Sequence, residues 1–192
     1  IFILILHILS KCITGVVIML CVPMVFATTH TVISPASIRS AVASASAGDT
    51  VFLRRGVFNE HGIVINKPLV VIGESGTFID AQSRGSSIMM IRGDHVYVSG
   101  ITFKNVHVEY TNDNAAVKFD SSTYCVIERC SVINGFFGIY FARSSHCVIQ
   151  NNVLSASNNG ESQSGNGIHL WTCRNITIIG NTIKGHRDGI YF

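Results

Sequence analysis

The chain has 192 residues, of which 47% are hydrophobic and only 13% are charged, and its formal net charge is +3. This length fits a single domain with a sizeable core. The basic residues are scattered along the chain and form no cluster, which argues against nucleic-acid binding. Few charges and abundant Ser, Thr, Asn and Gly are typical of a fold with polar, uncharged turns.

The first 27 residues predict an export leader. Lys11 precedes an apolar run over residues 13–27 that ends in Val-Phe-Ala, with small residues where a signal peptidase recognises its substrate. Residues 1–9 are also apolar, so the alternative is a retained membrane anchor. We therefore expect a signal peptide or membrane leader at 1–27 and one domain at 28–192.

A short amphipathic helix is predicted at the start of this domain. Ser34-Pro35 is typical of a helix start, with Ser as N-cap and Pro in the first turn, and Gly48 is typical of a helix end. The apolar residues at helical spacing are Ile38, Ala41, Val42 and Ala45. We expect this apolar stripe to cover the open end of the strands that follow, since a covered end cannot pair with other chains.

An internal repeat predicts the architecture of the rest. Four segments align without gaps: Ala116-Val117-Lys118-Phe119, Gly138-Ile139-Tyr140-Phe141, Gly167-Ile168-His169-Leu170 and Gly189-Ile190-Tyr191-Phe192. They begin at residues 116, 138, 167 and 189, so the offsets are 22, 29 and 22 residues. We assign the seven extra residues of the longer coil to the polar stretch 157–165. Second and third strands recur in phase, centred on Val126, Val148 and Thr177 and on Val132, Leu154 and Ile183.

Three short strands per repeat cannot bury their apolar faces unless the repeats stack, about 4.8 Å apart. We therefore predict an all-β fold, a right-handed single-stranded parallel β-helix with about 22 residues per coil and a short N-terminal capping helix. Strand alternation predicts an internal file of side chains: Ile139, Phe141, Ile168, Leu170, Ile190 and Phe192. We also expect Asn152 and Asn181 to stack at one corner and Cys125 and Cys147 to face the core.

Two stretches carry a family resemblance. Residues 37–80, with Ala47-Gly48-Asp49-Thr50-Val51 at their centre, resemble the capped first coil of pectin-lyase-like β-helices and of carbohydrate-binding and sugar-hydrolase repeat domains. Residues 165–171 and 181–192 are similar to the NosD family, and with the segment around Phe137-Gly138-Ile139-Tyr140 the similarity covers roughly residues 31–192.

The resemblance to the NosD family implies a non-catalytic protein of the periplasm. Such a protein assists maturation of the copper–sulfur centre of nitrous oxide reductase, as a docking scaffold with an inner-membrane ABC transporter. The implied partners are the reductase and the transporter, which would associate the chain with the membrane, and copper is the implied cofactor. The family's proteins are longer, so we expect the domain at 28–192 to be truncated at its C-terminus.

The outward positions of the repeating strand form a candidate partner-binding face: Lys118, Tyr140, His169 and Tyr191. A stacked row of this kind is suited to holding a protein or a polymer. The alternative is a solvated face on which the aromatic rings cover one another.

Copper would require imidazole and soft sulfur ligands that converge. The candidate ligands are His169, His186, His107, Met89 and Met90, although no H-x-H, M-x-x-M or C-x-x-C spacing accompanies them. The alternative is that these are ordinary turn, surface and core residues.

The alternative function is a polysaccharide-binding or polysaccharide-cleaving β-helix. Cleavage on such a surface requires clustered carboxylates. The acidic residues here are sparse, with no Asp-Asp pair, and Asp188 beside Arg187 is interpreted as an ion pair. We therefore predict a protein that is not an enzyme.

Overall fold

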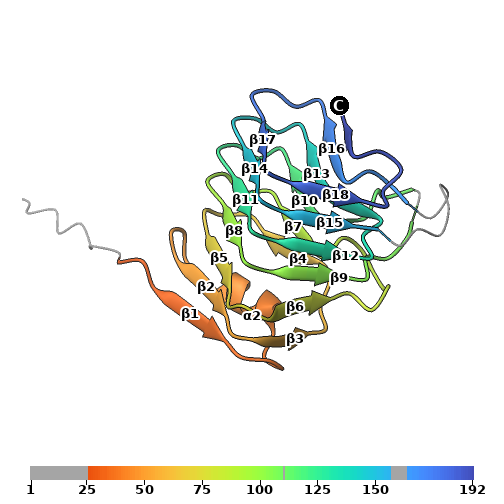
Figure 1. Cartoon of the computed structure of the whole chain (residues 1–192). Helices are drawn as coiled ribbons and strands as arrows, with labels where there is room; N and C mark the ends of the chain where they lie inside the picture. The colour runs from red at the N-terminus through yellow and green to blue at the C-terminus, as the bar shows by residue number, and fades with distance from the viewer. Residues whose placement is uncertain (1–25, 110, 157–163) are drawn as a thin grey trace, which may run out of the picture.

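The computed structural model describes residues 26–109, 111–156 and 164–192. These residues wind into a right-handed parallel β-helix, whose coils stack from β1 at one end to β19 at the other (Figure 1). The predicted all-β fold is confirmed. The leader expected at 1–27, apart from its last two residues, and most of the insertion expected at 157–165 lie outside the described residues.

Each full coil contributes one strand to each of three parallel sheets. Sheet A contains β1 (Thr29–Val32), β2 (Thr50–Leu53), β5 (Val70–Gly73), β8 (Tyr97–Ser99), β11 (Val126–Glu128), β14 (Val148–Gln150) and β17 (Thr177–Ile179). Sheet B contains β3 (Gly56–Phe58), β6 (Thr77–Asp80), β9 (Thr102–Lys104), β12 (Ser131–Ile133), β15 (Val153–Ser155) and β18 (Thr182–Lys184). Sheet C contains β4 (Ile63–Ile65), β7 (Met89–Ile91), β10 (Ala115–Asp120), β13 (Phe137–Ala142), β16 (Ile168–Trp171) and β19 (Ile190–Tyr191).

The register between coils is the one that the repeat predicts. In sheet C, Ile139 pairs with Ile168, which pairs with Ile190. The strands of sheets A and B align in the same way, at Val126–Val148–Thr177 and at Val132–Leu154–Ile183. A one-residue slip would turn every apolar side chain of a strand outward, so burial holds this register.

The interior of the coils is a continuous apolar column. Phe119 and Phe141 stack there with ring centroids 4.0 Å apart and planes at 6°. Of the predicted internal file, Ile139, Phe141 and Ile168 are fully buried and Leu170 is half-buried. In the last described coil Ile190 keeps the predicted register by pairing with Ile168, but it is 45% exposed and Phe192 is 92% exposed. Within the described residues no further coil lies against β19, so one side of Ile190 and of Phe192 faces solvent.

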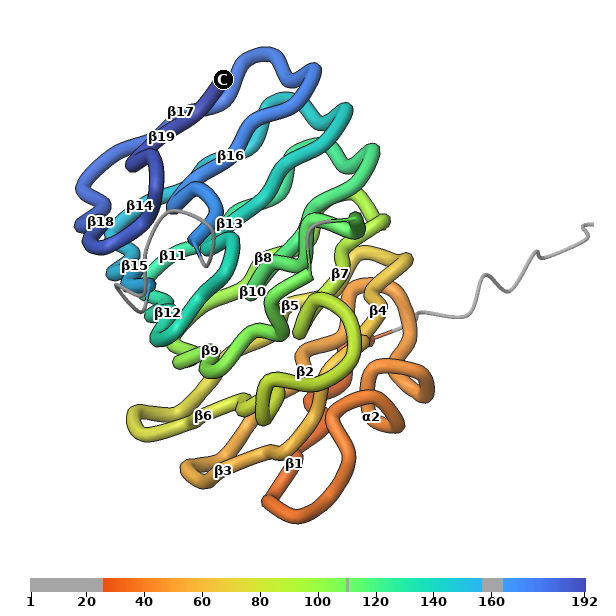
Figure 2. The backbone as a smooth tube through the Cα atoms, turned by 90° about the vertical axis from the view of Figure 1, so that its right-hand side faces the viewer, coloured from red at the N-terminus to blue at the C-terminus, as the bar shows by residue number. Residues whose placement is uncertain are grey.

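The helix α2 (Ile38–Ser44) lies at the N-terminal end of the stack and packs against β4, β1 and β2 (Figure 2). Its stripe points inward, with Ile38, Val42 and Ala45 buried and Ala41 half-buried against the core. Strand β1 was not predicted; it extends sheet A by pairing with β2. Within the described ranges no helix is long and apolar enough to cross a membrane.

The start of α2 differs from the prediction. Ser37, and not Ser34, is the N-cap, and Pro35 lies in the turn that precedes it. The Glu60 carboxylate, which comes from the next coil, accepts the Ile38 N–H at 2.7 Å. A carboxylate at this position satisfies free N–H groups and interacts favourably with the helix dipole, which fixes where the helix begins.

The end of α2 also differs from the prediction. The helix ends at Ser44 with Ala45 as C-cap, before Gly48. The Lys67 ammonium donates to the carbonyl oxygens of Ala43, at 3.2 Å, and Ala45. A cation from the following coil therefore satisfies the last carbonyls of the helix.

The predicted Asn stack is confirmed at the corner between sheets A and B. The side chain of Asn152 is fully buried; its Oδ1 accepts the Cys130 N–H at 3.0 Å and its Nδ2 donates to the Ile127 carbonyl at 3.1 Å. Asn181, one coil on, accepts the Asn152 N–H at 2.9 Å. Each amide thus satisfies backbone groups of the preceding coil. One coil before Asn152, Cys130 occupies the equivalent position and provides no amide.

The cysteines of the described coils are free thiols. Cys125 and Cys147 are buried, as predicted, and the Cys125 N–H donates to the Cys147 Sγ at 3.4 Å. Burial raises the pKa of Cys130 to about 12. These side chains therefore pack as small apolar residues.

The Asn152→Ala variant should lower the free energy of unfolding by roughly 2–3 kcal/mol, because a buried N–H and a buried carbonyl would lose their partner. Urea denaturation followed by circular dichroism measures this value. Asn59→Ala is the control, because its side chain is exposed and its change should stay within about 0.5 kcal/mol. Equal losses in both variants would contradict a role for the Asn stack.

Candidate functional site

An aromatic column follows the outer face of sheet C. Lys118, Tyr140, His169 and Tyr191 occupy successive rungs of the sheet. The rings of Tyr140 and His169 stack with centroids 4.4 Å apart, and those of His169 and Tyr191 stack at 5.0 Å. The Lys118 ammonium lies 4.7 Å from the Tyr140 ring centroid, within cation–π range. The four candidate residues are therefore brought together as one stack, which we call the outer column.

The middle of the outer column is covered. Tyr140 and His169 are only 6% and 8% exposed, because their rings cover each other and Phe137 packs edge-on against both, at 5.4 Å. Trp171 and Tyr191 are 55% and 44% exposed. Trp171 is therefore an exposed aromatic side chain beside the column, while Tyr191 lies on the last described coil, with no further described coil against it.

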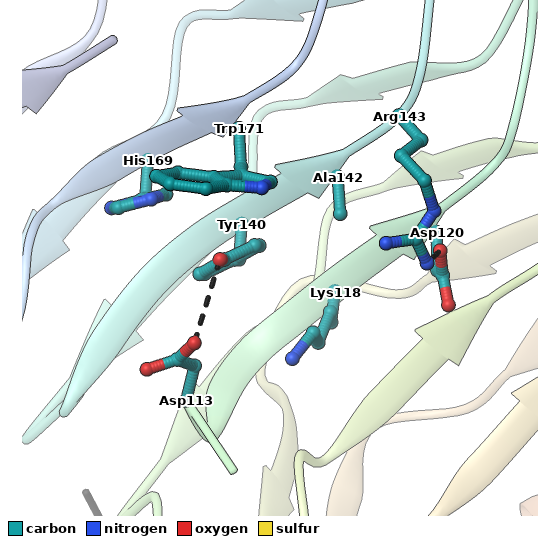
Figure 3. A pocket seen from close by; sticks show the side chains of 8 residues that line it. All are labelled: Asp113, Lys118, Asp120, Tyr140, Ala142, Arg143, His169 and Trp171. Atoms are coloured by element: carbon teal, nitrogen blue, oxygen red, sulfur yellow. Dashed lines mark hydrogen bonds and ion pairs between the residues drawn. The ribbon is translucent and has the colours of Figure 1, made fainter. Parts of the chain in front are cut away.

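A groove of about 390 Å³ runs beside the outer column (Figure 3). It is lined by Asp113, Lys118, Asp120, Tyr140, Ala142, Arg143, His169 and Trp171. Asp120, Ala142 and Trp171 are successive rungs of sheet C, so the small Ala142 lies between two larger side chains. The repeat alone does not predict this groove. The alternation that places His169 outward also places Trp171 outward, and this signal could have located the groove.

The charges in the groove are paired with one another. The Arg143 guanidinium donates to the Asp120 carboxylate, and Arg92 lies 3.9 Å from the same group. Burial lowers the pKa of Lys118, and the nearby Asp113 carboxylate opposes that shift. The groove therefore contains charged groups without a large excess of either sign.

Tyr140 donates a hydrogen bond toward Asp113 across the groove. The distance from its hydroxyl to the Asp113 Oδ2 is 3.5 Å. Burial, followed by the proximity of this carboxylate, raises the pKa of Tyr140 to about 12. The phenol is therefore neutral at pH 7 and acts only as a hydrogen-bonding group.

The orientation of the His169 ring is fixed by a buried amide. Arg187 donates to the Asn166 Oδ1 at 3.2 Å, so the Asn166 Nδ2 faces the His169 Nδ1, at 2.8 Å. An amide nitrogen can only donate, which makes Nδ1 the acceptor and places the imidazole proton on Nε2. Within the described residues this buried Nε2 has no hydrogen-bond partner. Burial lowers the pKa of His169.

The predicted copper ligands do not form one site. Met89 is buried in the core, where its thioether cannot join an exterior ligand set, while the adjacent Met90 lies outside, paired with Lys118. The His107 Nδ1 donates to a backbone carbonyl at 3.0 Å. Across the described ranges no group of three His, Cys, Asp or Glu side chains is arranged to hold a metal ion.

The two remaining candidates, His169 and His186, both have buried ring nitrogens that lack hydrogen-bond partners among the described residues. Burial lowers the pKa of His186. The Nδ1 of His169 is nevertheless engaged with Asn166, and among the described residues neither ring belongs to a group of three His, Cys, Asp or Glu side chains that could hold a metal ion. The described residues therefore do not fit a copper centre.

His169 should titrate below the ordinary histidine pKa of about 6.5. Because its folded pKa is lowered, the unfolded chain binds more protons, so the stabilisation is complete above about pH 6.5 and is lost as the pH falls. Histidine side-chain ¹H–¹⁵N spectra should show a neutral Nε2–H tautomer at pH 7. Asn166→Ala should increase the population of the other tautomer. A titration at or above pH 6.5, or an Nδ1–H tautomer in the unsubstituted chain, would contradict this arrangement.

Comparison with known proteins identifies relatives of this chain. Residues 42–192 match the family described as periplasmic copper-binding protein (NosD). The "probable ABC transporter binding protein NosD" of Pseudomonas aeruginosa is 26% identical over 128 residues, which are 66% of this chain and 30% of the relative. The protein of the same name from Stutzerimonas stutzeri is 29% identical over 133 residues, which are 65% of this chain and 29% of the relative.

Two solved structures of pectin methylesterase are similar at the level of the backbone. The complex with hexasaccharide VII has a TM-score of 0.47 and the mutant complex with hexasaccharide IV has 0.46. Both are 16% identical to this chain, and the matches cover 77% of this chain and 66% of the enzyme.

The chain spans about 30% of the length of the curated relatives it matches. Because the family match covers more than three quarters of the chain, the protein belongs to the NosD family.

Proposed function

We propose that this chain is a non-catalytic docking scaffold of the periplasm, which works with an inner-membrane ABC transporter in maturing the copper–sulfur centre of nitrous oxide reductase. Membership of the NosD family supports the periplasmic accessory role, and relatives named as ABC transporter binding proteins support a transporter partner. The observation that carries the docking role is the exposed Trp171 side chain beside the outer column, whose rings stack on one another up to Tyr191.

The exposed end of the outer column has the properties of a docking anchor. Trp and Tyr are the residue types most often found at energetic hot spots of protein interfaces. Tyr191 is held by stacking on His169, and Trp171 lies on the same face of β16. Little side-chain entropy remains to be lost on binding, which favours affinity.

The acidic residues of the face support a scaffold rather than a hydrolase. Asp120 is paired with Arg143, and Asp113 lies beside Lys118 and Tyr140. General acid–base catalysis needs carboxyl groups that are free to exchange protons with a substrate, and the Asp120 carboxylate is engaged in an ion pair instead. In this proposal copper belongs to the reductase's own centre, and no step is assigned to a copper ion held by these coils.

Polysaccharide binding is the second candidate function. The observation that favours it is the groove, in which an exposed indole and hydrogen-bonding side chains line one open space. Binding of this kind needs no catalytic carboxylate, so it is compatible with a protein that is not an enzyme.

Removing both exposed rings should weaken docking. In a pull-down with apo-reductase and the ABC transporter, the Trp171→Ala, Tyr191→Ala double variant of the full chain should bind at least tenfold more weakly than the unsubstituted chain, because hot-spot truncations each cost about 2 kcal/mol or more.

The control for that experiment is the double variant Ile133→Ala, Val153→Ala, which removes exposed apolar side chains from sheet B. Its binding should be unchanged. If the unsubstituted chain captures neither partner, the scaffold proposal is wrong. If both double variants bind equally well, the docking surface lies elsewhere than the outer column.

A further inference from the structure

A buried carboxylate lies where β1 begins. Asp49 is only 4% exposed, and its Oδ1 accepts the Thr28 N–H at 2.8 Å. Its Oδ2 accepts the Ser46 N–H and lies opposite the His30 Nε2, at 2.8 Å in each case. These contacts lower the pKa of Asp49 to about 2, and the hydrogen bond from Thr28 is the largest cause. The side chain therefore holds a negative charge at neutral pH.

No permanently charged cation neutralises this carboxylate among the described residues. The one side chain that forms an ion pair with Asp49 there is His30, and an imidazole is cationic only when it is protonated. Thr28 and Ser46 contribute backbone N–H dipoles but no net charge. A buried carboxylate is costly unless a positive charge lies beside it. The surroundings of Asp49 therefore suit one further cationic group.

The backbone nitrogen of Thr28 is held in place beside this carboxylate. The Thr28 carbonyl accepts the Thr50 N–H at 2.9 Å, next to the register of β1 on β2. Asp49 is fixed by its own backbone, which donates to the Ser46 carbonyl at 3.1 Å and accepts the Val70 N–H at 3.0 Å. A change of charge on the Thr28 nitrogen would therefore not require it to move.

The predicted export leader ends at this same nitrogen. Residues 25–27 have the sequence Val-Phe-Ala, which fits the pattern before a signal-peptidase cleavage site. Phe26 is 77% exposed and Ala27 is also exposed, and both precede β1. Hydrolysis of the Ala27–Thr28 bond consumes one water molecule, leaves a carboxylate on Ala27 and gives Thr28 a free amino group. That group is protonated at neutral pH, because the ordinary pKa of an α-amino group is about 8.

We propose that a signal peptidase cleaves the chain between Ala27 and Thr28, and that the buried Asp49 carboxylate binds the Thr28 α-ammonium group that cleavage creates. A charge-assisted hydrogen bond then replaces a neutral one and neutralises the buried charge. Cleavage thereby fixes the new N-terminus to β1, which pairs only with β2 among the described strands. A retained leader would refute this proposal and leave the docking role intact, so the two proposals fail separately.

The first experiment identifies the N-terminus of the exported protein. The full chain, preceded by an initiator methionine, is expressed in a Gram-negative bacterium and purified from both the periplasmic and the membrane fractions. N-terminal sequencing and intact mass should find Thr28 as the first residue. A product that retains the leader, or that begins at another residue, would overturn the proposal.

The second experiment measures the pKa of the Thr28 α-ammonium group in the processed protein. The pH dependence of acylation of the N-terminal peptide, followed by mass spectrometry, gives this value. We expect a pKa clearly above the ordinary value of about 8, because a neighbouring carboxylate favours the charged form. A pKa at or below about 8 in the unsubstituted chain would contradict binding by Asp49.

Two variants of the exported chain test the role of Asp49 in holding the ammonium group. Asp49→Asn removes the negative charge and should lower the pKa of the α-ammonium by about 1 or more. Glu74→Gln is the matched control, with this pKa unchanged, because Glu74 also accepts a backbone N–H, from Arg55 at 3.0 Å, but is paired with Arg54. Circular dichroism establishes that each variant is folded.

The comparison of the variants gives two further outcomes that would overturn the proposal. One is an unchanged pKa of the α-ammonium in a folded Asp49→Asn variant, and the other is an equal decrease in both variants. If Asp49→Asn does not fold, the pKa in the unsubstituted chain decides the question, since that measurement needs no substitution.

Discussion

In-register stacking of the coils is the constraint on which the rest of the structure depends. Each strand completes its backbone hydrogen bonds only with the copies above and below it, so every side chain lies over its equivalent in the neighbouring coils. The same alignment builds the apolar interior, the stack of Asn152 on Asn181 and the outer column of sheet C. A substitution at one rung therefore acts on a whole file of residues.

The fold could be predicted because its repeating unit is visible as a regular period along the sequence. A period of about 22 residues gives the number of strands, their partners and their register, and alternation gives the buried face. The ends of the stack could not be predicted equally well. The start of α2 depends on Glu60 and its end on Lys67, both of which come from the following turns of the chain. Phe192 has the pattern of a core residue, but burial also requires a neighbour on each side.

The candidate site was predicted in part for the same reason. The register places Tyr140, His169 and Tyr191 in one file, but it does not give the fraction of each ring that neighbours cover. The buried amide of Asn166 and the groove beside the outer column depend on side-chain packing. A sequence repeat does not contain this information. The prediction of copper ligands rests on residue type alone. Met89 faces the core and Met90 faces outward, so the two thioethers cannot join one site. The chain belongs to a family described as copper-binding, but within the described residues the geometry does not bring the predicted copper ligands together.

Cysteine pairs introduced on the outer face of sheet B test the register most directly. Val153 pairs with Thr182, and both are exposed, as is Lys184 two residues further along the same strand. The Cα atoms of the in-register pair should lie about 5 Å apart, within disulfide range, whereas the offset pair should be separated by about 8 Å, beyond it. Under mild oxidation, peptide mass spectrometry should find a disulfide in the Val153→Cys, Thr182→Cys variant and none in the Val153→Cys, Lys184→Cys variant. Preferential cross-linking of the offset pair would contradict the stacking of the coils.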